Sequence, residues 1–490
     1  MAAMNSIRLW LLAGALLAGC TSTVTPDDQP TMTRAELLDP AKCQSCHPDQ
    51  YKDWAASMHA YAADDPVFRA MHARGQRETQ GKLGTFCLKC HAPQAVADGL
   101  LTTGTEDLDK LPAGYKGISC FFCHSVEGVA ETHNNGLQLA TDLALRGPIG
   151  DPLKTSAHRS LYSALHDRDQ LASSTLCGSC HDVVTPQGAP LERGFLEWHG
   201  SVFNQSPGGN TCGQCHMPQS PQPKAVAVVE GAPIRHLHSH SLPAVDTPLT
   251  AWPDKDVQIK AVQALLDRTL QSAVCVQKVG AGARLAVTLD NVASGHGFPS
   301  GAALDRRLWV EVVARKAGQI VYQTGAVADD AVVDAGTDPD LWLLRDCGYD
   351  AAGQSVHMFW EVASVMGNAL PVQLTFNPGD PKFYQSHVRA DFPANGGKLA
   401  EMPDEVAVRV RLQPVAREVL DGLLATGDLT AAVRDAMPTW QVGPTLTWTP
   451  ATATHTFQQD GLATSCRTET NLNPQADSVP ALRMPGCQKP

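Results

Sequence analysis

A five-residue pattern, Cys-x-x-Cys-His, occurs five times between residues 43 and 216 and constrains this chain more than any other feature. The copies are Cys43-Gln-Ser-Cys46-His47, Cys87-Leu-Lys-Cys90-His91, Cys120-Phe-Phe-Cys123-His124, Cys177-Gly-Ser-Cys180-His181 and Cys212-Gly-Gln-Cys215-His216. Random placement of the chain's cysteines and histidines would give on the order of 0.02 such pentapeptides. Composition alone therefore does not explain the repeat.

The spacing suits the covalent attachment of haem. Two thiols three positions apart can add to the two vinyl groups of one haem, while the adjoining histidine ligates the iron. Structural zinc sites use pairs of CxxC motifs and do not need a histidine after each, and a dithiol redox site expects a single CxxC near a βαβ unit. The repeat predicts five haems c, bound by its ten cysteines, with its five histidines as iron ligands.

The distance between motifs predicts the architecture around them. Successive motifs begin 44, 33, 57 and 35 residues apart, which is too short for each to have its own hydrophobic core. We expect an α+β multidomain protein in which residues 40–250 form short helices and loops wrapped around five packed haems.

The second axial ligands decide between an electron carrier and a catalyst. His59 ends a pattern with helical spacing over residues 51–59, and His158 and His240 lie in polar segments that could present an imidazole. His133 precedes a turn signal, Asn134-Asn135-Gly136, and is a further candidate. For each, the alternative is an ordinary surface or hydrogen-bonded histidine.

In the C-terminal half, the spacing of apolar residues along the sequence changes. A linking helix is expected within residues 251–275, followed by strands with alternating apolar residues in a β-sandwich over residues 276–415, and by helical turns and a tail over residues 416–490. The loop Ser294–Gly301 places His296 between two glycines. His296 is either an iron ligand that ties this domain to the haems or a turn residue without a redox role.

Four cysteines remain after the motifs and Cys20 are set aside: Cys275, Cys347, Cys466 and Cys487. They can form two disulfides in three ways, and the sequence does not choose among them. A Cys466–Cys487 bond would tie down the C-terminal tail.

The first residues indicate secretion and lipidation. Arg8 and an apolar run precede Leu17-Ala18-Gly19-Cys20, as in a signal peptide over residues 1–19 with cleavage before Cys20. The alternative is an ordinary signal peptide with an incidental cysteine. Acylation of Cys20, followed by a tether over residues 20–39, would place the protein on the periplasmic face of the outer membrane or on the cell surface.

The motifs and their flanks resemble the multihaem cytochromes related to the tetrahaem cytochrome c-554. The resemblance rests on Cys46-His47-Pro48 with Trp54, Gly117-Ile118-Ser119-Cys120, Glu197-Trp198 and Cys215-His216-Met217-Pro218. It implies stacked haems with histidine on most faces, electron transfer among redox partner proteins, and His59, His158 and His240 as distal ligands. The His296 loop, with Arg306 and Arg307 after it, is similar to a loop of larger multihaem cytochromes.

Two functions follow from these predictions. If all irons have two axial ligands, the protein relays electrons from periplasmic or membrane donors to an outer-membrane or extracellular acceptor. If one iron keeps an open face, the protein is an oxidoreductase acting on a small nitrogen or sulfur compound. A net charge of -12 without any basic block argues against a nucleic-acid partner, and the oligomeric state stays open.

Overall fold

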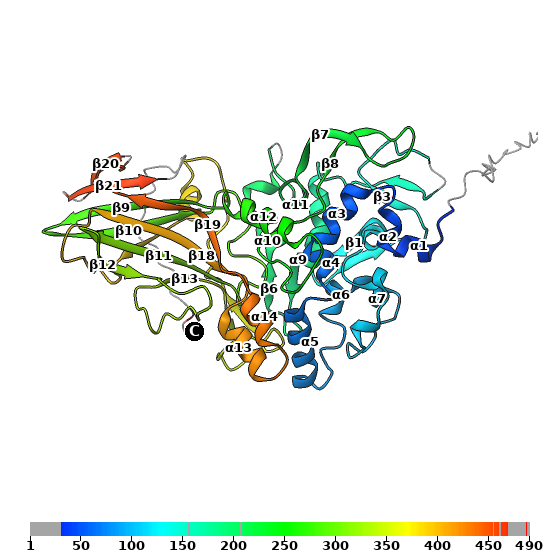
Figure 1. Ribbon diagram of the computed structural model, residues 1–490, viewed down its shortest axis with the longest axis horizontal. Coiled ribbons are helices and arrows are strands. Elements are labelled where there is room, and N and C mark those ends of the chain that lie inside the picture. The colour runs from blue at the N-terminus through cyan, green and yellow to red at the C-terminus, as the bar shows by residue number, and fades with distance from the viewer. Residues whose placement is uncertain are drawn as a thin grey trace, which may run out of the picture.

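The computed structural model describes residues 31–154, 157–205, 208–453, 455–459, 462–468 and 487. The expected signal peptide and Cys20 lie outside these residues. Short helices and small sheets make up one part of the molecule, and long strands make up the other (Figure 1). The chain is therefore an α+β protein of more than one part, as the sequence indicated.

The N-terminal part consists of short elements joined by loops. Its helices are α1 (Arg34–Leu38), α2 (Pro40–Cys43), α3 (Pro48–Ala56), α4 (Met58–Tyr61), α5 (Pro66–Glu78), α6 (Leu88–His91), α7 (Pro93–Ala97), α8 (Cys120–His124), α9 (Ser174–His181), α10 (Gly194–Gly200) and α11 (Cys212–His216). Its strands form two-stranded sheets: β1 (Val126–Glu131) with β2 (Gly136–Leu139), β3 (Leu145–Gly147) with β4 (Ser160–Tyr162), β5 (Asp182–Val184) with β6 (Pro190–Arg193), and β7 (Gln219–Ala225) with β8 (Ile234–His238). The 3-10 turns are η2 (Leu108–Lys110), η3 (Ala113–Tyr115), η4 (Leu171–Ser173) and η5 (Val202–Asn204).

The C-terminal part follows α12 (Lys255–Leu266) and contains two larger antiparallel sheets. In the first, the order is β17 (His387–Phe392), β10 (Gly282–Asp290), β9 (Gln271–Val279), β21 (Leu462–Thr468) and β20 (His455–Gln459). In the second, it is β12 (Gln319–Thr324), β11 (Arg307–Lys316), β18 (Glu405–Gln413) and β19 (Trp440–Trp448), with β13 (Trp342–Leu344) also on β11. The smaller elements are β14 (Cys347–Tyr349), β15 (Ser355–Val356), β16 (Ser364–Met366), η6 (Pro381–Ser386), α13 (Arg417–Ala425) and α14 (Ala431–Ala436).

Both larger sheets contribute to one hydrophobic core. Side chains that alternate along β10 and β11, such as Leu285 and Val310, are fully buried in it, and Leu266 of α12 packs against them. This burial explains the period of two in the sequence, because alternate residues of a strand point to the same face.

The strands extend beyond the expected limits of residues 276–415. β9 begins at Gln271, and β19 to β21 follow residue 415. Gly443-Pro444 interrupts the apolar pattern of β19, and its pairing with β18 shifts in register between Val408 and Val410. The apolar run at residues 372–376 has the composition of a strand and lies within the expected sandwich, but it has no regular structure.

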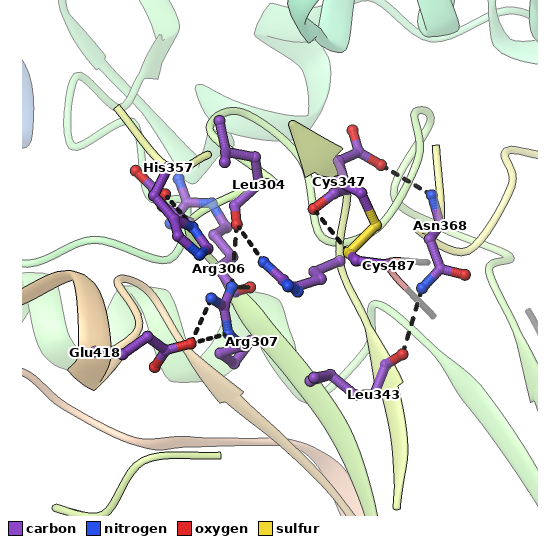
Figure 2. Close-up of a disulfide and its surroundings, with 12 residues drawn as sticks. Leu304, Arg306, Arg307, Leu343, Cys347, His357, Asn368, Glu418 and Cys487 are labelled. Carbon is purple, nitrogen blue, oxygen red and sulfur yellow. Dashed lines mark hydrogen bonds and ion pairs between the residues drawn. A yellow bond between two sulfur atoms is a disulfide. The ribbon is translucent and has the colours of Figure 1, made fainter. Parts of the chain in front are cut away.

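The four remaining cysteines form two disulfides, Cys275–Cys466 and Cys347–Cys487. The first joins the paired strands β9 and β21. The second is shown in Figure 2, near the ion pair between Arg307 and Glu418. The suggested Cys466–Cys487 bond is therefore wrong, because Cys466 lies directly opposite Cys275 in the sheet.

Contacts between side chains hold the two parts together. Leu420 and Leu423 of α13 pack with Val67 of α5, and Arg77 pairs with Asp428 at 2.6 Å. No helix among the described residues is both long and apolar enough to span a membrane.

Candidate haem-binding centre

Four of the five motifs lie wholly or mostly on one short helix each: α6, α8, α9 and α11. The first motif begins at the end of α2, and its histidine precedes α3. Ser119 and Thr211 cap the starts of α8 and α11 by accepting hydrogen bonds from backbone amides. On a helix, positions i, i+3 and i+4 share a face, so both thiols and the imidazole of a motif lie on the same side.

The ten motif cysteines form no disulfide with one another. Thiols from different motifs lie within hydrogen-bonding reach in three places, between Cys43 and Cys120, Cys90 and Cys180, and Cys177 and Cys212. These contacts raise the pKa values of Cys120, Cys180 and Cys177 well above the ordinary value. Charge interactions of Cys123 with Cys177 and Cys180 join these contacts, so the five motifs converge on one interior region.

Most motif imidazoles are oriented through one ring nitrogen. The Nδ1–H groups of His47, His91, His124 and His216 each donate to a backbone carbonyl, at distances of 2.5 to 3.0 Å. A hydrogen bond at Nδ1 fixes the tautomer and leaves the Nε2 lone pair free to bind a metal, as is usual for metal-binding histidines.

Burial keeps these imidazoles neutral. It lowers the pKa of His91 and of His124 to about 4, and the pKa of the distal candidate His59 to about 3. The neutral form is the one that ligates metal ions. The donor set, with paired free thiols and neutral imidazoles, fits haem c.

Three candidate distal histidines lie opposite motif histidines. The ring centroids are 6.2 Å apart for His158 and His47, 6.1 Å for His59 and His181, and 6.4 Å for His296 and His216. Metal–imidazole bonds are about 2 Å long, so two imidazoles on opposite sides of one metal ion have centroids about 6 Å apart. All three pairs have the separation that an iron between them requires.

The third motif has two imidazoles nearby. The ring of His166 stacks on that of His124 with centroids 5.6 Å apart, but its Nε2–H donates to the Cys123 carbonyl at 2.8 Å. His240 instead donates from Nδ1 to the His238 carbonyl, so its Nε2 is free, and its charge interaction adds to the burial that lowers the pKa of His124. His240 therefore has the tautomer of a ligand, and His166 does not.

The second motif differs from the others. Phe68 stacks on the ring of His91 at 3.8 Å, and His72, beyond Phe68, bonds through Nε2 to the Gly104 carbonyl. Within the described part of the chain, no histidine ring is found opposite His91 at the separation seen in the three pairs. His133 lies on the β1–β2 turn, and Asn135 of that turn bonds to the Lys89 carbonyl of this motif, but no contact of His133 with a motif histidine is seen there.

The His296 loop is held against the N-terminal part. The Gly297 amide donates to the Glu197 carboxylate at 2.8 Å, and the His296 Nδ1–H donates to the Gly297 carbonyl at 2.8 Å. A Cβ atom at Gly297 would lie 2.8 Å from a Glu197 oxygen, so the loop backbone and the Glu197 carboxylate approach closely.

Sequence reasoning did not identify Phe68 as a neighbour of the second motif, or Glu197 as the support of the His296 loop. Both contacts join residues that are far apart in the chain. Glu197 appeared only within the resemblance, as part of Glu197-Trp198, and no local pattern marks Phe68.

Comparison with known proteins agrees with this donor set. Residues 42–125 match the family described as cytochrome c554 and c-prime. A penta-haem cytochrome c552 from Thermochromatium tepidum has a similar fold, with a TM-score of 0.56, 20% sequence identity and coverage of 85% of this chain and 98% of that one. No curated protein matches the chain.

The five repeated attachment motifs and their free thiols are the features of a multihaem c-type cytochrome. Residues 42–125 are similar to the cytochrome c554 family, and the fold is similar to that of a penta-haem cytochrome. The cofactor of the chain is haem c, and the function of its class is electron transfer.

Proposed function

We propose that the protein binds five haems c and relays electrons between a periplasmic or membrane donor and an outer-membrane or extracellular acceptor. The observation that carries this proposal is the set of three imidazole pairs at 6.1 to 6.4 Å. An iron with imidazole on both sides exchanges electrons without binding a substrate, which is the property of a carrier.

We assign three axial pairs from the ring separations and the fourth from the tautomers of two histidines. His47 pairs with His158, His181 with His59, and His216 with His296. His124 pairs with His240, whose free Nε2 distinguishes it from His166. Four irons then have two imidazole ligands. The remaining iron, that of the second motif, has His91 as its protein ligand.

The thiol contacts support an order of haems. Covalent bonds to neighbouring thiols bring haem edges together, so the first haem neighbours the third, the second neighbours the fourth, and the fourth neighbours the fifth. Interactions of Cys123 with Cys177 and Cys180 join the third motif to the fourth. The fourth haem is then the junction of the relay.

The relay is attached to a membrane by acylation of Cys20, on the periplasmic side of the outer membrane or on the cell surface. The lipobox-like sequence Leu17-Ala18-Gly19-Cys20 supports this placement. The C-terminal part, as a β-sandwich, supplies His296 and closes one end of the haem region.

Electron paramagnetic resonance of the oxidised holoprotein, with and without cyanide or nitrite, tests the proposal. We expect low-spin signals from four haems, unchanged by either ligand, because both axial positions of their irons are filled. Ligand-induced changes at two or more haems would contradict it.

A second candidate function rests on His91. Because no imidazole is seen opposite it among the described residues, its haem has a face on which a small nitrogen or sulfur compound could bind. Nitrite-dependent or hydroxylamine-dependent redox turnover by the isolated protein tests this function. Turnover that cyanide abolishes would favour this catalytic function. Absence of turnover would leave electron relay as the proposed function.

A further inference from the structure

Exposed apolar side chains gather at the tip of the β7–β8 hairpin. Val228 is 67% exposed and Ile234 is 59% exposed, with Val229 beside them. Leu153, from the segment before β4, is 38% exposed and lies 4.0 Å from a Cβ built at Gly231 of the hairpin. We call Leu153, Val228, Val229 and Ile234 the hairpin patch.

Basic side chains surround the hairpin patch, although the chain as a whole has a charge of -12. Lys154 and Arg159 are exposed in the segment 151–162, and Lys224 and Arg235 are exposed on paired positions of the hairpin. The two segments contain two exposed acidic residues, Asp151, which pairs with Arg235 at 3.2 Å, and Glu230. Lys224 also pairs with Asp49 of α3. The two segments thus carry more exposed positive than negative charge.

The chain enters the described structure beside this surface. The Met32 amide donates to the Ala157 carbonyl at 3.1 Å, next to the basic segment. Cys20 is eleven residues before Thr31, so the extended chain between them can span at most about 40 Å. A lipid on Cys20 would hold this surface close to a bilayer.

We infer that the hairpin patch and its basic rim rest on the surface of an anionic lipid membrane. The inference rests on the proposed acylation of Cys20 and specifies how the anchored protein is oriented. Apolar side chains at a protruding tip enter the headgroup region, and exposed lysine and arginine attract anionic lipids. In Figure 1 the hairpin, β3 and α1 all lie in the part of the molecule away from the long sheets.

The hairpin also holds the first haem motif. The Val228 amide donates to the Cys46 carbonyl at 2.8 Å, and His47 donates to the Val226 carbonyl at 3.0 Å. A hairpin on the membrane therefore makes the first haem the one nearest to the lipid.

Vesicle binding by the unacylated holoprotein tests the patch apart from the anchor. We would use the full mature chain with Cys20→Ser, secreted without lipidation, and vesicles of phosphatidylcholine with and without phosphatidylglycerol. We expect salt-sensitive binding to the anionic vesicles. The double variant Val228→Asp/Ile234→Asp should weaken this binding about tenfold or more, because it removes apolar contacts and adds negative charge.

The matched control is Ile320→Asp, at an exposed position on β12 in the other part of the molecule, which should bind like the parent protein. The inference would be overturned if Ile320→Asp lost as much vesicle binding as the double variant. It would also be overturned if the Cys20→Ser parent did not bind the anionic vesicles.

Amide exchange provides a measurement that needs no change in the hairpin patch. In the acylated wild type, residues 219–238 should exchange more slowly on vesicles than in detergent-free solution of the Cys20→Ser protein, whereas β11 and β18 should be unchanged. Unchanged exchange in the hairpin would overturn the inference, as would protection by a soluble redox protein without vesicles. The mass of the N-terminal peptide reports acylation separately, so failure of the anchor and failure of the patch are distinguishable.

Discussion

His296 is the residue through which the C-terminal part reaches the haem region. Its ring lies nearly parallel to that of His216, at an angle of 10°, and the Gly297–Glu197 hydrogen bond fixes its loop. A loop histidine without such support would be mobile. The supported loop has the rigidity that a permanent axial ligand needs.

Changing His296 to Ala should convert the haem of Cys212 and Cys215 from low spin to high spin. About one quarter of the low-spin intensity should be lost, because one of the four irons with two imidazoles loses an axial ligand. Electron paramagnetic resonance of the oxidised variant measures this. The control His199→Ala changes an exposed histidine that does not face a motif histidine, and an unchanged spectrum in His296→Ala would remove this residue from the ligand set.

The third site offers a direct choice between two histidines. His240→Ala should create a high-spin haem, whereas His166→Ala should not, because the Nε2 of His166 is already bonded to the Cys123 carbonyl. The same spin measurement on both variants decides the assignment. The opposite result would exchange the roles of the two residues.

At the level of single residues, the sequence alone predicted much of the candidate site. The attachment residues follow from the pentapeptide alone, and His59, His158 and His296 do lie opposite motif histidines. The sequence could not assign partners, because the paired histidines are 80 to 122 positions apart and only folding brings them together. His133 stays a prediction without a partner in the described residues.

Short helices position the motifs, and long strands build the rest. Helical spacing predicted the helix that α3 and α4 share between residues 48 and 61, but not the break at Ser57, whose side chain caps α4. Alternation predicted β10, β11 and β18 because every second residue over much of each strand lies in the shared hydrophobic core. It failed for residues 372–376, where the Gln373 carbonyl bonds to Val202 in place of a neighbouring strand.

The disulfide between β9 and β21 should stabilise the first sheet. It closes a loop with a sequence separation of 191 residues, and its loss through Cys275→Ala/Cys466→Ala should lower the free energy of unfolding by about 2–5 kcal/mol. Thermal unfolding measures the change. The visible haem spectrum should stay the same, because neither cysteine belongs to a haem motif, and an unchanged melting temperature would contradict the prediction.

Asp65, which caps the start of α5, should make stability depend on pH. Burial raises its pKa from 3.8 to about 6, so the folded state binds this proton more tightly than the unfolded state. The contribution of the protonated Asp65 carboxyl to the free energy of unfolding is therefore lost as the pH rises from about 4 to about 6.

The variant Asp65→Asn keeps a side-chain oxygen that can cap α5 but cannot ionise. Its free energy of unfolding should be about 1–3 kcal/mol higher than that of the wild type at pH 7, and the two values should become equal near pH 4. Denaturant unfolding at both pH values checks this. A variant that is less stable at pH 7 would show that the carboxylate is stabilised by its surroundings.

At the scale of the whole molecule, the two parts act as one unit. Arg306 of the C-terminal part pairs with Asp246 at 3.0 Å, and Arg77 of α5 pairs with Asp428. Together with the His216–His296 pair, these contacts fix the fifth motif relative to the sheets. The proposed relay therefore has two distinct ends, the hairpin patch beside the first haem and the C-terminal part beside the fifth.

The proposed ligation places four of the five irons between two imidazoles. Near-infrared magnetic circular dichroism of the fully oxidised protein tests this ligation, because the technique distinguishes bis-imidazole ligation from other axial pairs. We predict bis-imidazole intensity equivalent to four haems per chain. Intensity equivalent to three haems or fewer, or a band from a different ligand pair at any of these four sites, would contradict it.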